Sequence, residues 1–146
     1  MQIIIGSDHA GFKMKEEIRK YVEKLGHKIL DYGTNSEESV DYPDIAGKVA
    51  GDVVKQKKIG ILICGSGTGV TIAANKIKGA RAALCFDEFT AKTSREHNDA
   101  NILCLAGRDM TLGQAKKITK TWLDTEFSNE ERHKRRIEKV MRLEKC

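Results

Sequence analysis

The sequence contains no hydrophobic run long enough to cross a membrane, and its start shows no basic stretch followed by a long apolar segment. We therefore expect a cytoplasmic protein without a membrane span or signal peptide, in which cysteines stay reduced. No two cysteines form a Cys-x-x-Cys pair, which argues against zinc-ribbon and thioredoxin-type sites. The four cysteines are Cys64, Cys85, Cys104 and Cys146.

Aromatic residues are also scarce, at 5% of the chain, and proline occurs once, at Pro43, in an expected turn before a helix. The remaining composition, with 40% hydrophobic and 32% charged residues, is typical of a globular protein. A length of 146 residues suits one domain spanning 1–146. The net charge of +5 is compatible with an anionic partner, but equally with none.

Short apolar runs alternate with segments of helical periodicity along the whole chain. Each run is no longer than a strand and is followed within two residues by glycine or aspartate. Between the runs, apolar residues recur at spacings of three and four, as in 14–25, 45–53 and 115–122. The expected strands lie at 3–5, near 29–30, and at 59–64, 80–85 and 102–105.

This alternation predicts an α/β protein with a parallel sheet and helices on both of its faces. The runs 61–63 and 82–84 are apolar at successive positions, as expected of strands that are buried on both sides. In such sheets, ligands bind beyond the carboxyl ends of the strands. Candidate site residues should therefore follow the strands directly.

The most informative of these segments is Cys64-Gly65-Ser66-Gly67-Thr68-Gly69. Its three alternate glycines let the backbone turn tightly and bring N–H groups close to a ligand, and a helix expected from near Val70 directs its positive end to the same point. Such a loop suits a phosphate or a developing oxyanion. It matches neither the Walker A loop nor the dinucleotide-binding pattern. A tight strand-to-helix turn without a ligand remains the alternative.

Cys64 stands at the head of this loop, where the N-terminus of a helix favours the thiolate form of a cysteine. A thiolate can act as a nucleophile or as a proton acceptor, whereas most buried cysteines are structural. Chemistry alone leaves both alternatives open for Cys64. Cys85 and Cys104 lie in or at the end of apolar strands without a glycine loop, so we expect them to be structural.

Two polar pairs provide further candidates. Asp8 and His9 follow the first expected strand, where a carboxylate could bind sugar hydroxyls and an imidazole could bind phosphate. Asp8 could equally cap the next helix. His97 and Asn98 close the helix before the last strand, and His97 suits acid/base chemistry if it faces the crevice. A helix C-cap and turn is the alternative for this pair.

The segment 132–136 is densely basic. Arg132 and Arg136 are four residues apart, so on a helix they share one face and could clamp a phosphate together. A solvated helix and a nucleic-acid patch are the alternatives. Interspersed acidic residues and the low aromatic content argue against the nucleic-acid patch.

Taken together, these segments resemble ribose-5-phosphate isomerase of type B over nearly the whole chain. Each motif alone is modest, but the ordered set with its spacing is specific. The matching segments are 6–12 (Gly-Ser-Asp-His-Ala-Gly-Phe), 41–43 (Asp-Tyr-Pro), 61–69, 72–76 (Ile-Ala-Ala-Asn-Lys), 94–101, and Arg132-His133 with Arg136.

The resemblance implies a Rossmann-like three-layer α/β sandwich with about five parallel strands and helices on both faces. It also implies a homodimer or dimer of dimers with active sites at the subunit interface, and neither metal nor cofactor. The implied reaction interconverts D-ribose 5-phosphate and D-ribulose 5-phosphate through a cis-enediolate, a step of the pentose phosphate pathway.

Roles for individual residues follow from the same resemblance. Cys64 is the base that moves a proton between C1 and C2, and His97 opens the furanose ring with help from the Ser66 hydroxyl. Backbone N–H groups of the glycine loop stabilise the enediolate oxygen. This part of the expected site contains Gly65, Gly67, Thr68 and Gly69.

The remaining roles concern binding of the sugar and its phosphate. By the same resemblance, Asp8 and Asn98 bind sugar hydroxyls, and Tyr42 lines the pocket. Arginines for the phosphate come largely from the partner subunit. The expected phosphate-binding residues are His9, Arg108, Arg132 and Arg136.

Two departures from the family pattern concern this site. Ser66 stands where many relatives have threonine, and it keeps the hydroxyl. Residues 129–131 (Asn-Glu-Glu) stand where relatives commonly have glycines, which places two acids near Arg132. An isomerase of galactose 6-phosphate or allose 6-phosphate is the nearest alternative function, and a non-catalytic phosphate-binding module is a more distant one.

Overall fold

The computed structural model describes residues 1–145 and contains a parallel sheet of five strands, in the order β2-β1-β3-β5-β4. In its three central strands Ile5 lies opposite Ile61, and Ile61 lies opposite Leu103. The expected α/β class with about five parallel strands is therefore confirmed. The strands are β1 (Gln2–Ser7), β2 (Lys28–Asp31), β3 (Ile59–Cys64), β4 (Ala82–Leu84) and β5 (Ile102–Ala106).

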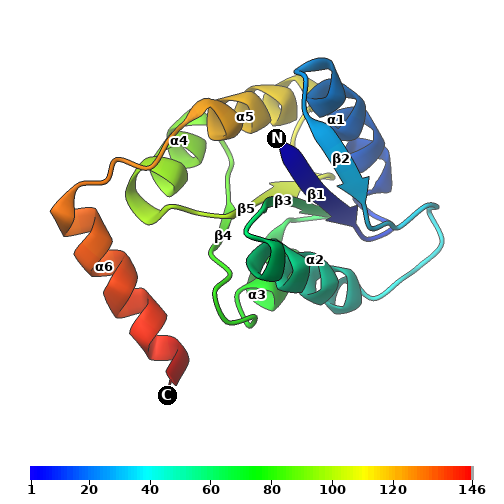
Figure 1. The fold of residues 1–146 in the computed structure, drawn as a ribbon. Coiled ribbons are helices and arrows are strands. Elements are labelled where there is room, and N and C mark those ends of the chain that lie inside the picture. Colours follow the sequence, from blue (N-terminus) through cyan, green and yellow to red (C-terminus); the bar gives the residue numbers. More distant parts are fainter. Residues whose placement is uncertain (146) are drawn as a thin grey trace.

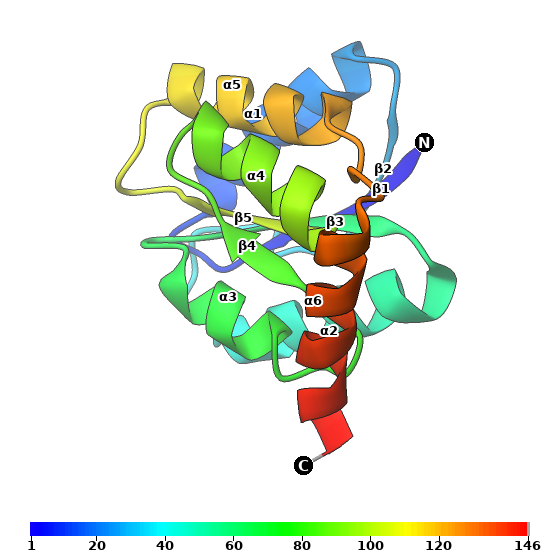
Figure 2. The same cartoon turned by 90° about the vertical axis from the view of Figure 1, so that its left-hand side faces the viewer.

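Helices cover both faces of the sheet (Figure 1). The helices α1, α4 and α5 pack on one face and α2 and α3 on the other, while α6 crosses beside the β4 edge (Figure 2). No helix within residues 1–145 is both long and apolar enough to span a membrane. The helices are α1 (Phe12–Lys24), α2 (Tyr42–Gln56), α3 (Thr68–Ala74), α4 (Glu88–Asn98), α5 (Leu112–Asp124) and α6 (Glu131–Arg142), followed by the short 3-10 helix η1 (Leu143–Lys145).

Successive residues of the central strands enter opposite layers of the core. In β3, Ile61 and Ile63 pack in the layer of α1, α4 and α5, whereas Leu62 and Cys64 pack in the layer of α2 and α3. A parallel sheet covered on both faces requires such uninterrupted apolar strands. Cys64 is therefore a core residue of the α3 layer that also ends its strand.

Three boundaries differ from those expected from the sequence. The helix expected after Pro43 starts at Tyr42, so the proline lies in its first turn, where a missing N–H costs no hydrogen bond. The helix expected from near Val70 starts two residues earlier, at Thr68. The strand expected at 80–85 is shorter, since only residues 82–84 pair with β5.

The chain reverses its direction of winding between β1 and β3. The helix after β1, α1, lies on one face of the sheet, and the helix after β3, α3, lies on the other. Adjacent parallel strands whose following helices leave to opposite faces open a crevice at their carboxyl ends. Ser7 and Cys64 end these two strands, so the fold places their successors side by side.

An ion pair between a buried lysine and a partly exposed aspartate ties α1 to the end of β2. The Lys15 side chain is fully buried, and its Nζ lies 2.6 Å from Asp31 Oδ2 and 3.0 Å from Glu16 Oε1. The other carboxylate oxygen of Asp31 accepts a hydrogen bond from the N–H of Gly33 at 2.9 Å. These partners are essential, because desolvation of an unpaired ammonium costs several kcal/mol.

We expect Asp31→Asn to lower the free energy of unfolding by about 2–3 kcal/mol, since it leaves the Lys15 ammonium with Glu16 as its remaining carboxylate partner. The exposed pair of Lys120 with Asp124 offers a matched control, and Asp124→Asn should cost about 0.5 kcal/mol or less. Urea unfolding measures both variants. Equal losses of unfolding free energy in the two variants would show that the Lys15–Asp31 pair stabilises the protein no more than an exposed pair does.

Candidate active site

A pocket of about 570 Å³ opens at the carboxyl ends of β1 and β3. Ala10 and Asp109 line it although neither was a predicted site residue. Ala10 directly follows His9 and Asp109 directly follows Arg108, both predicted site residues just beyond a strand end. This position in the sequence was the signal that could have identified them. The predicted site residues that line the pocket are Asp8, His9, Tyr42, Cys64, Gly65, Ser66, Gly69 and Arg108.

Cys64 is held in this pocket by hydrogen bonds at both ends of the residue. Its Sγ accepts from the N–H of Gly67 at 3.1 Å, and its carbonyl accepts from the N–H of Gly107 at 2.7 Å. The residue is 5% exposed. An amide N–H aimed at sulfur is a contact that a thiolate can use, and the thiolate is the form of a cysteine that takes up a proton.

The turn from β3 into α3 depends on its glycines. Gly67 has a φ of 75°, and a Cβ there would lie 2.4 Å from Leu84 Cδ1. A Cβ on Gly69 would lie 2.8 Å from the ring of Tyr42. This close packing places the first turn of α3 at the pocket, where its N–H groups have no partner within the helix and can face a ligand.

The rest of the loop positions one hydroxyl and one cation. Ser66 is exposed, and its Oγ accepts from the N–H of Thr68 at 3.3 Å. The N–H of Arg108 donates to the carbonyl of Gly65 at 2.9 Å, which places the exposed arginine beside the loop. Gly67 and Thr68 do not themselves line the pocket, although both belong to the loop that forms its wall.

Asp8 and His9 occupy the opposite wall, after β1. Asp8 Oδ1 accepts from the N–H of Gly11 at 3.0 Å; Gly11 precedes α1, so Asp8 stabilises the turn and does not cap the helix itself. His9 Nδ1 accepts from the N–H of Val40 at 3.2 Å. The proton of a neutral His9 ring is then on Nε2, which can donate to a ligand.

Cys85 and Cys104 are fully buried and do not line the pocket. Burial raises the pKa of the Cys104 thiol to about 12 and also raises the pKa of Cys85. Both thiols are therefore neutral near pH 7, in agreement with the structural role expected for them. Within residues 1–145, no three His, Cys, Asp or Glu side chains come together as a metal site.

The other four predicted site residues, His97, Asn98, Arg132 and Arg136, do not line this pocket. His97 and Asn98 end α4, and the two arginines lie on α6. A helix after a parallel strand runs back along the sheet, so α4 ends at the amino edge. Cys64 lies at the carboxyl edge, and α6 crosses beside β4 (Figure 2).

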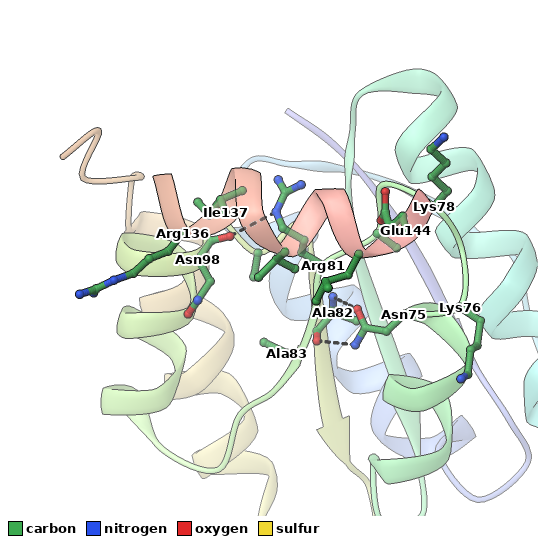
Figure 3. A pocket seen from close by; sticks show the side chains of 14 residues that line it. Asn75, Lys76, Lys78, Arg81, Ala82, Ala83, Asn98, Arg136, Ile137 and Glu144 are labelled. Carbon is green, nitrogen blue, oxygen red and sulfur yellow. Dashed lines mark hydrogen bonds between the residues drawn. The ribbon is translucent and has the colours of Figure 1, made fainter. Parts of the chain in front are cut away.

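Part of this second group lines another pocket, of about 820 Å³, between α6 and the sheet edge (Figure 3). Asn98 and Arg136 lie on one side of it, and Lys76 and Lys78 on the other. On the same helix, Arg132 Nε donates to Glu130 Oε2 at 2.7 Å, and Arg132 lowers the pKa of Glu130. The acid that departs from the family pattern is thus paired with a predicted phosphate ligand.

Comparison with known proteins shows the family. The model of the Ribose/Galactose Isomerase family matches residues 3–140. Ribose-5-phosphate isomerase B of Escherichia coli (strain K12) is 41% identical over 144 residues, covering 98% of this chain and 96% of that protein.

Solved structures agree in sequence and in fold. Ribose-5-phosphate isomerase B of Clostridium thermocellum is 49% identical with a TM-score of 0.97, covering 99% of this chain and 98% of that one. The Mycoplasma genitalium ribose-5-phosphate isomerase B, solved with bound ribulose-5-phosphate, is 43% identical with a TM-score of 0.94. The match covers 99% of this chain and 96% of that one. The chain therefore belongs to the Ribose/Galactose Isomerase family and is a sugar-phosphate isomerase of that family.

Proposed function

We propose that this protein interconverts D-ribose 5-phosphate and D-ribulose 5-phosphate through a cis-enediolate, as in the pentose phosphate pathway. The observation that carries the proposal is the Cys64 thiol, which lies in the pocket at the head of a glycine loop. A base beside a row of N–H donors suits proton transfer next to a carbonyl. The names of the similar proteins supply the pentose phosphate.

In the proposed enolisation, the Cys64 thiolate removes the proton from C2 of the open-chain aldose. The electron pair of that C–H bond forms the C1–C2 double bond, and negative charge develops on O1. N–H groups of the loop 65–69 stabilise this oxygen, and one such donor is typically worth ~10²–10³ in rate. A proton then passes from O2 to O1, and the charge on O2 re-forms the carbonyl at C2. The electron pair of the C1–C2 double bond takes up the proton of the Cys64 thiol at C1, which yields the ketose and regenerates the thiolate.

Ring opening precedes this step, because ribose 5-phosphate is mostly a furanose in solution. We assign it to His97, which donates a proton to the ring oxygen while the bond between C1 and that oxygen breaks and the O1 hydroxyl gives its proton to solvent. The Ser66 hydroxyl, exposed at the pocket, assists at the sugar oxygens. His97 and Cys64 thus serve separate steps of one reaction.

The remaining residues orient the substrate. Asp8 and Asn98 are assigned to the sugar hydroxyls, and Tyr42 forms a wall of the pocket. Phosphate far from the reacting carbons supplies binding energy that fixes the sugar. Its assigned ligands are the Nε2–H of His9 and the guanidinium groups of Arg108, Arg132 and Arg136.

This division of labour requires a second copy of the chain. His97 lies at the amino edge of the sheet and Cys64 at the carboxyl edge, so one chain does not bring them together. The exposed apolar residues Val140 and Leu143 on α6 and η1, at 52% and 68% exposure, suit coverage by another subunit. We therefore propose a homodimer or dimer of dimers in which each site takes Cys64 from one protomer and His97 from its partner.

Cys64→Ala should lower kcat for ribose 5-phosphate by about 10³-fold or more, because it removes the base. Exchange of the C1 hydrogen of ribulose 5-phosphate with D₂O should disappear with it, while the calorimetric Kd stays within about threefold. Cys85→Ala, in the core, is the matched control. Full activity of Cys64→Ala would overturn the assignment of Cys64 as the base, whereas ligand binding without isomerase activity in the unmutated protein would leave only a phosphate-binding module.

Sugar preference separates the proposed function from its nearest alternative. We expect kcat/KM to be at least about 10-fold higher for ribose 5-phosphate than for allose 6-phosphate or galactose 6-phosphate, since an extra carbon moves the phosphate away from its ligands. Coupled assays with the three aldoses measure this ratio. Equal or higher values for a hexose phosphate would replace the pentose assignment.

Mixing two inactive variants tests whether the site is shared. Cys64→Ala and His97→Ala, unfolded and refolded together in equal amounts, should recover about one quarter of wild-type activity. Half of the dimers are then mixed, and each mixed dimer has one complete site of its two. Refolding each variant alone is the control. No recovery from the mixture would place both residues in sites built by a single chain.

A further inference from the structure

Two histidine rings stack where α4 meets α6. The ring centroids of His97 and His133 are 4.4 Å apart, and the ring planes differ by 29°. His97 is exposed at the end of α4, whereas His133, in the first turn of α6, is 3% exposed. His133 is the buried residue of α6 and attaches the start of this helix, whose far end is held separately, where Met141 Sδ accepts from Arg81 Nη1 at 3.7 Å.

Ser128 connects the same two helices. Its N–H donates to the carbonyl of Glu96 in α4 at 3.1 Å, and its Oγ lies 2.6 Å from His133 Nδ1. The Oγ also accepts from the N–H of Glu130, the residue that precedes α6, at 3.2 Å. Ser128 therefore fixes the ring of His133 relative to the last turn of α4.

These contacts favour a neutral His133. The Ser128 oxygen already accepts from Glu130 N–H, so its own proton is available for Nδ1, which leaves the ring proton on Nε2. Burial lowers the pKa of His133, and His97, Arg132 and Arg136 lower it further against an opposing effect of Glu130. His133 thus adds no positive charge beneath His97.

We propose that His133 is a positioning residue for the ring-opening step: its neutral ring, held by Ser128, fixes the imidazole of His97 by stacking. This inference rests on the proposed role of His97. Free rotation of an exposed histidine would spread its donor over many directions, and general acid catalysis requires a donor within hydrogen-bond reach.

The chemistry of the two sugars separates this role from general structural support. The 5-hydroxyl of ribulose 5-phosphate is esterified, so the ketose cannot close a furanose ring. Exchange of its C1 hydrogen with D₂O therefore requires Cys64 but no ring opening. Conversion of ribose 5-phosphate requires both steps. A residue that positions His97 should therefore affect the conversion of ribose 5-phosphate and leave the C1 exchange of ribulose 5-phosphate unchanged.

His133→Ala should reduce kcat for ribose 5-phosphate about 10-fold or more, with KM within about twofold, because positioning of a general acid is lost and phosphate binding is kept. C1 exchange of ribulose 5-phosphate should stay within about twofold of wild type. His133→Phe, which keeps an aromatic ring beneath His97, should recover most of kcat. Arg135→Gln, an exposed residue of the same helix, should leave both rates unchanged.

His97→Ala, measured in parallel, distinguishes failure of this inference from failure of the proposed function. It should lower kcat for ribose 5-phosphate more strongly than His133→Ala does and should likewise spare C1 exchange of ribulose 5-phosphate. If both rates equal those of the wild type, His97 has no role in ring opening. If His97→Ala shows the selective loss but His133→Ala lowers both rates equally or raises KM, His133 has only a structural role. Failure of His133→Phe to recover kcat would equally overturn positioning by stacking.

Discussion

The common direction of the five strands is the constraint on which the rest of this molecule depends. Parallel strands collect their carboxyl ends on one edge, and there the protein places Cys64, the glycine loop, His9 and Arg108. The helices between strands run back, so α4 ends at the other edge with His97. Two sets of polar groups thus lie on opposite edges of one sheet, and a complete site of the proposed kind needs one edge from each of two chains.

A chain of short contacts holds the first of these sets in place. Lys15 pairs with Asp31, and Asp31 accepts the N–H of Gly33. The carbonyl of Gly33 in turn accepts the N–H of Ser7 at 2.7 Å, directly before Asp8 and His9. The ion pair of Lys15 with Asp31 does not line the pocket, but it therefore supports the segment that forms one of the pocket's walls. The buried Lys15 ammonium keeps these contacts in place, because losing its partners would leave a desolvated charge at a cost of several kcal/mol.

The second set is organised differently, by a small polar anchor on an exposed helix. His133 and Ser128 attach α6 to α4 through one stacked ring pair and the two hydrogen bonds that link Ser128 to His133 and to Glu96. Arg132, one residue away, pairs with Glu130 on the surface, so a phosphate would have to replace a carboxylate there. An exposed pair of this kind is weak. Exchange of Glu130 for phosphate is therefore energetically modest, and the unusual acid is compatible with phosphate binding.

Apolar runs and glycine spacing in the sequence determined the parallel α/β fold and the loop that begins at Cys64, because strands buried on both faces and tight turns are encoded locally. The sequence did not determine the start of α2 at Tyr42 or the short length of β4, because helix ends and strand pairing depend on residues that are neighbours in space. In the sequence, His133 belongs to a basic segment and to a segment that matches the family, and neither indicates which residue it contacts. Its stacking on His97 is a contact between residues 36 positions apart, and non-local packing of that kind was decided by the tertiary structure alone.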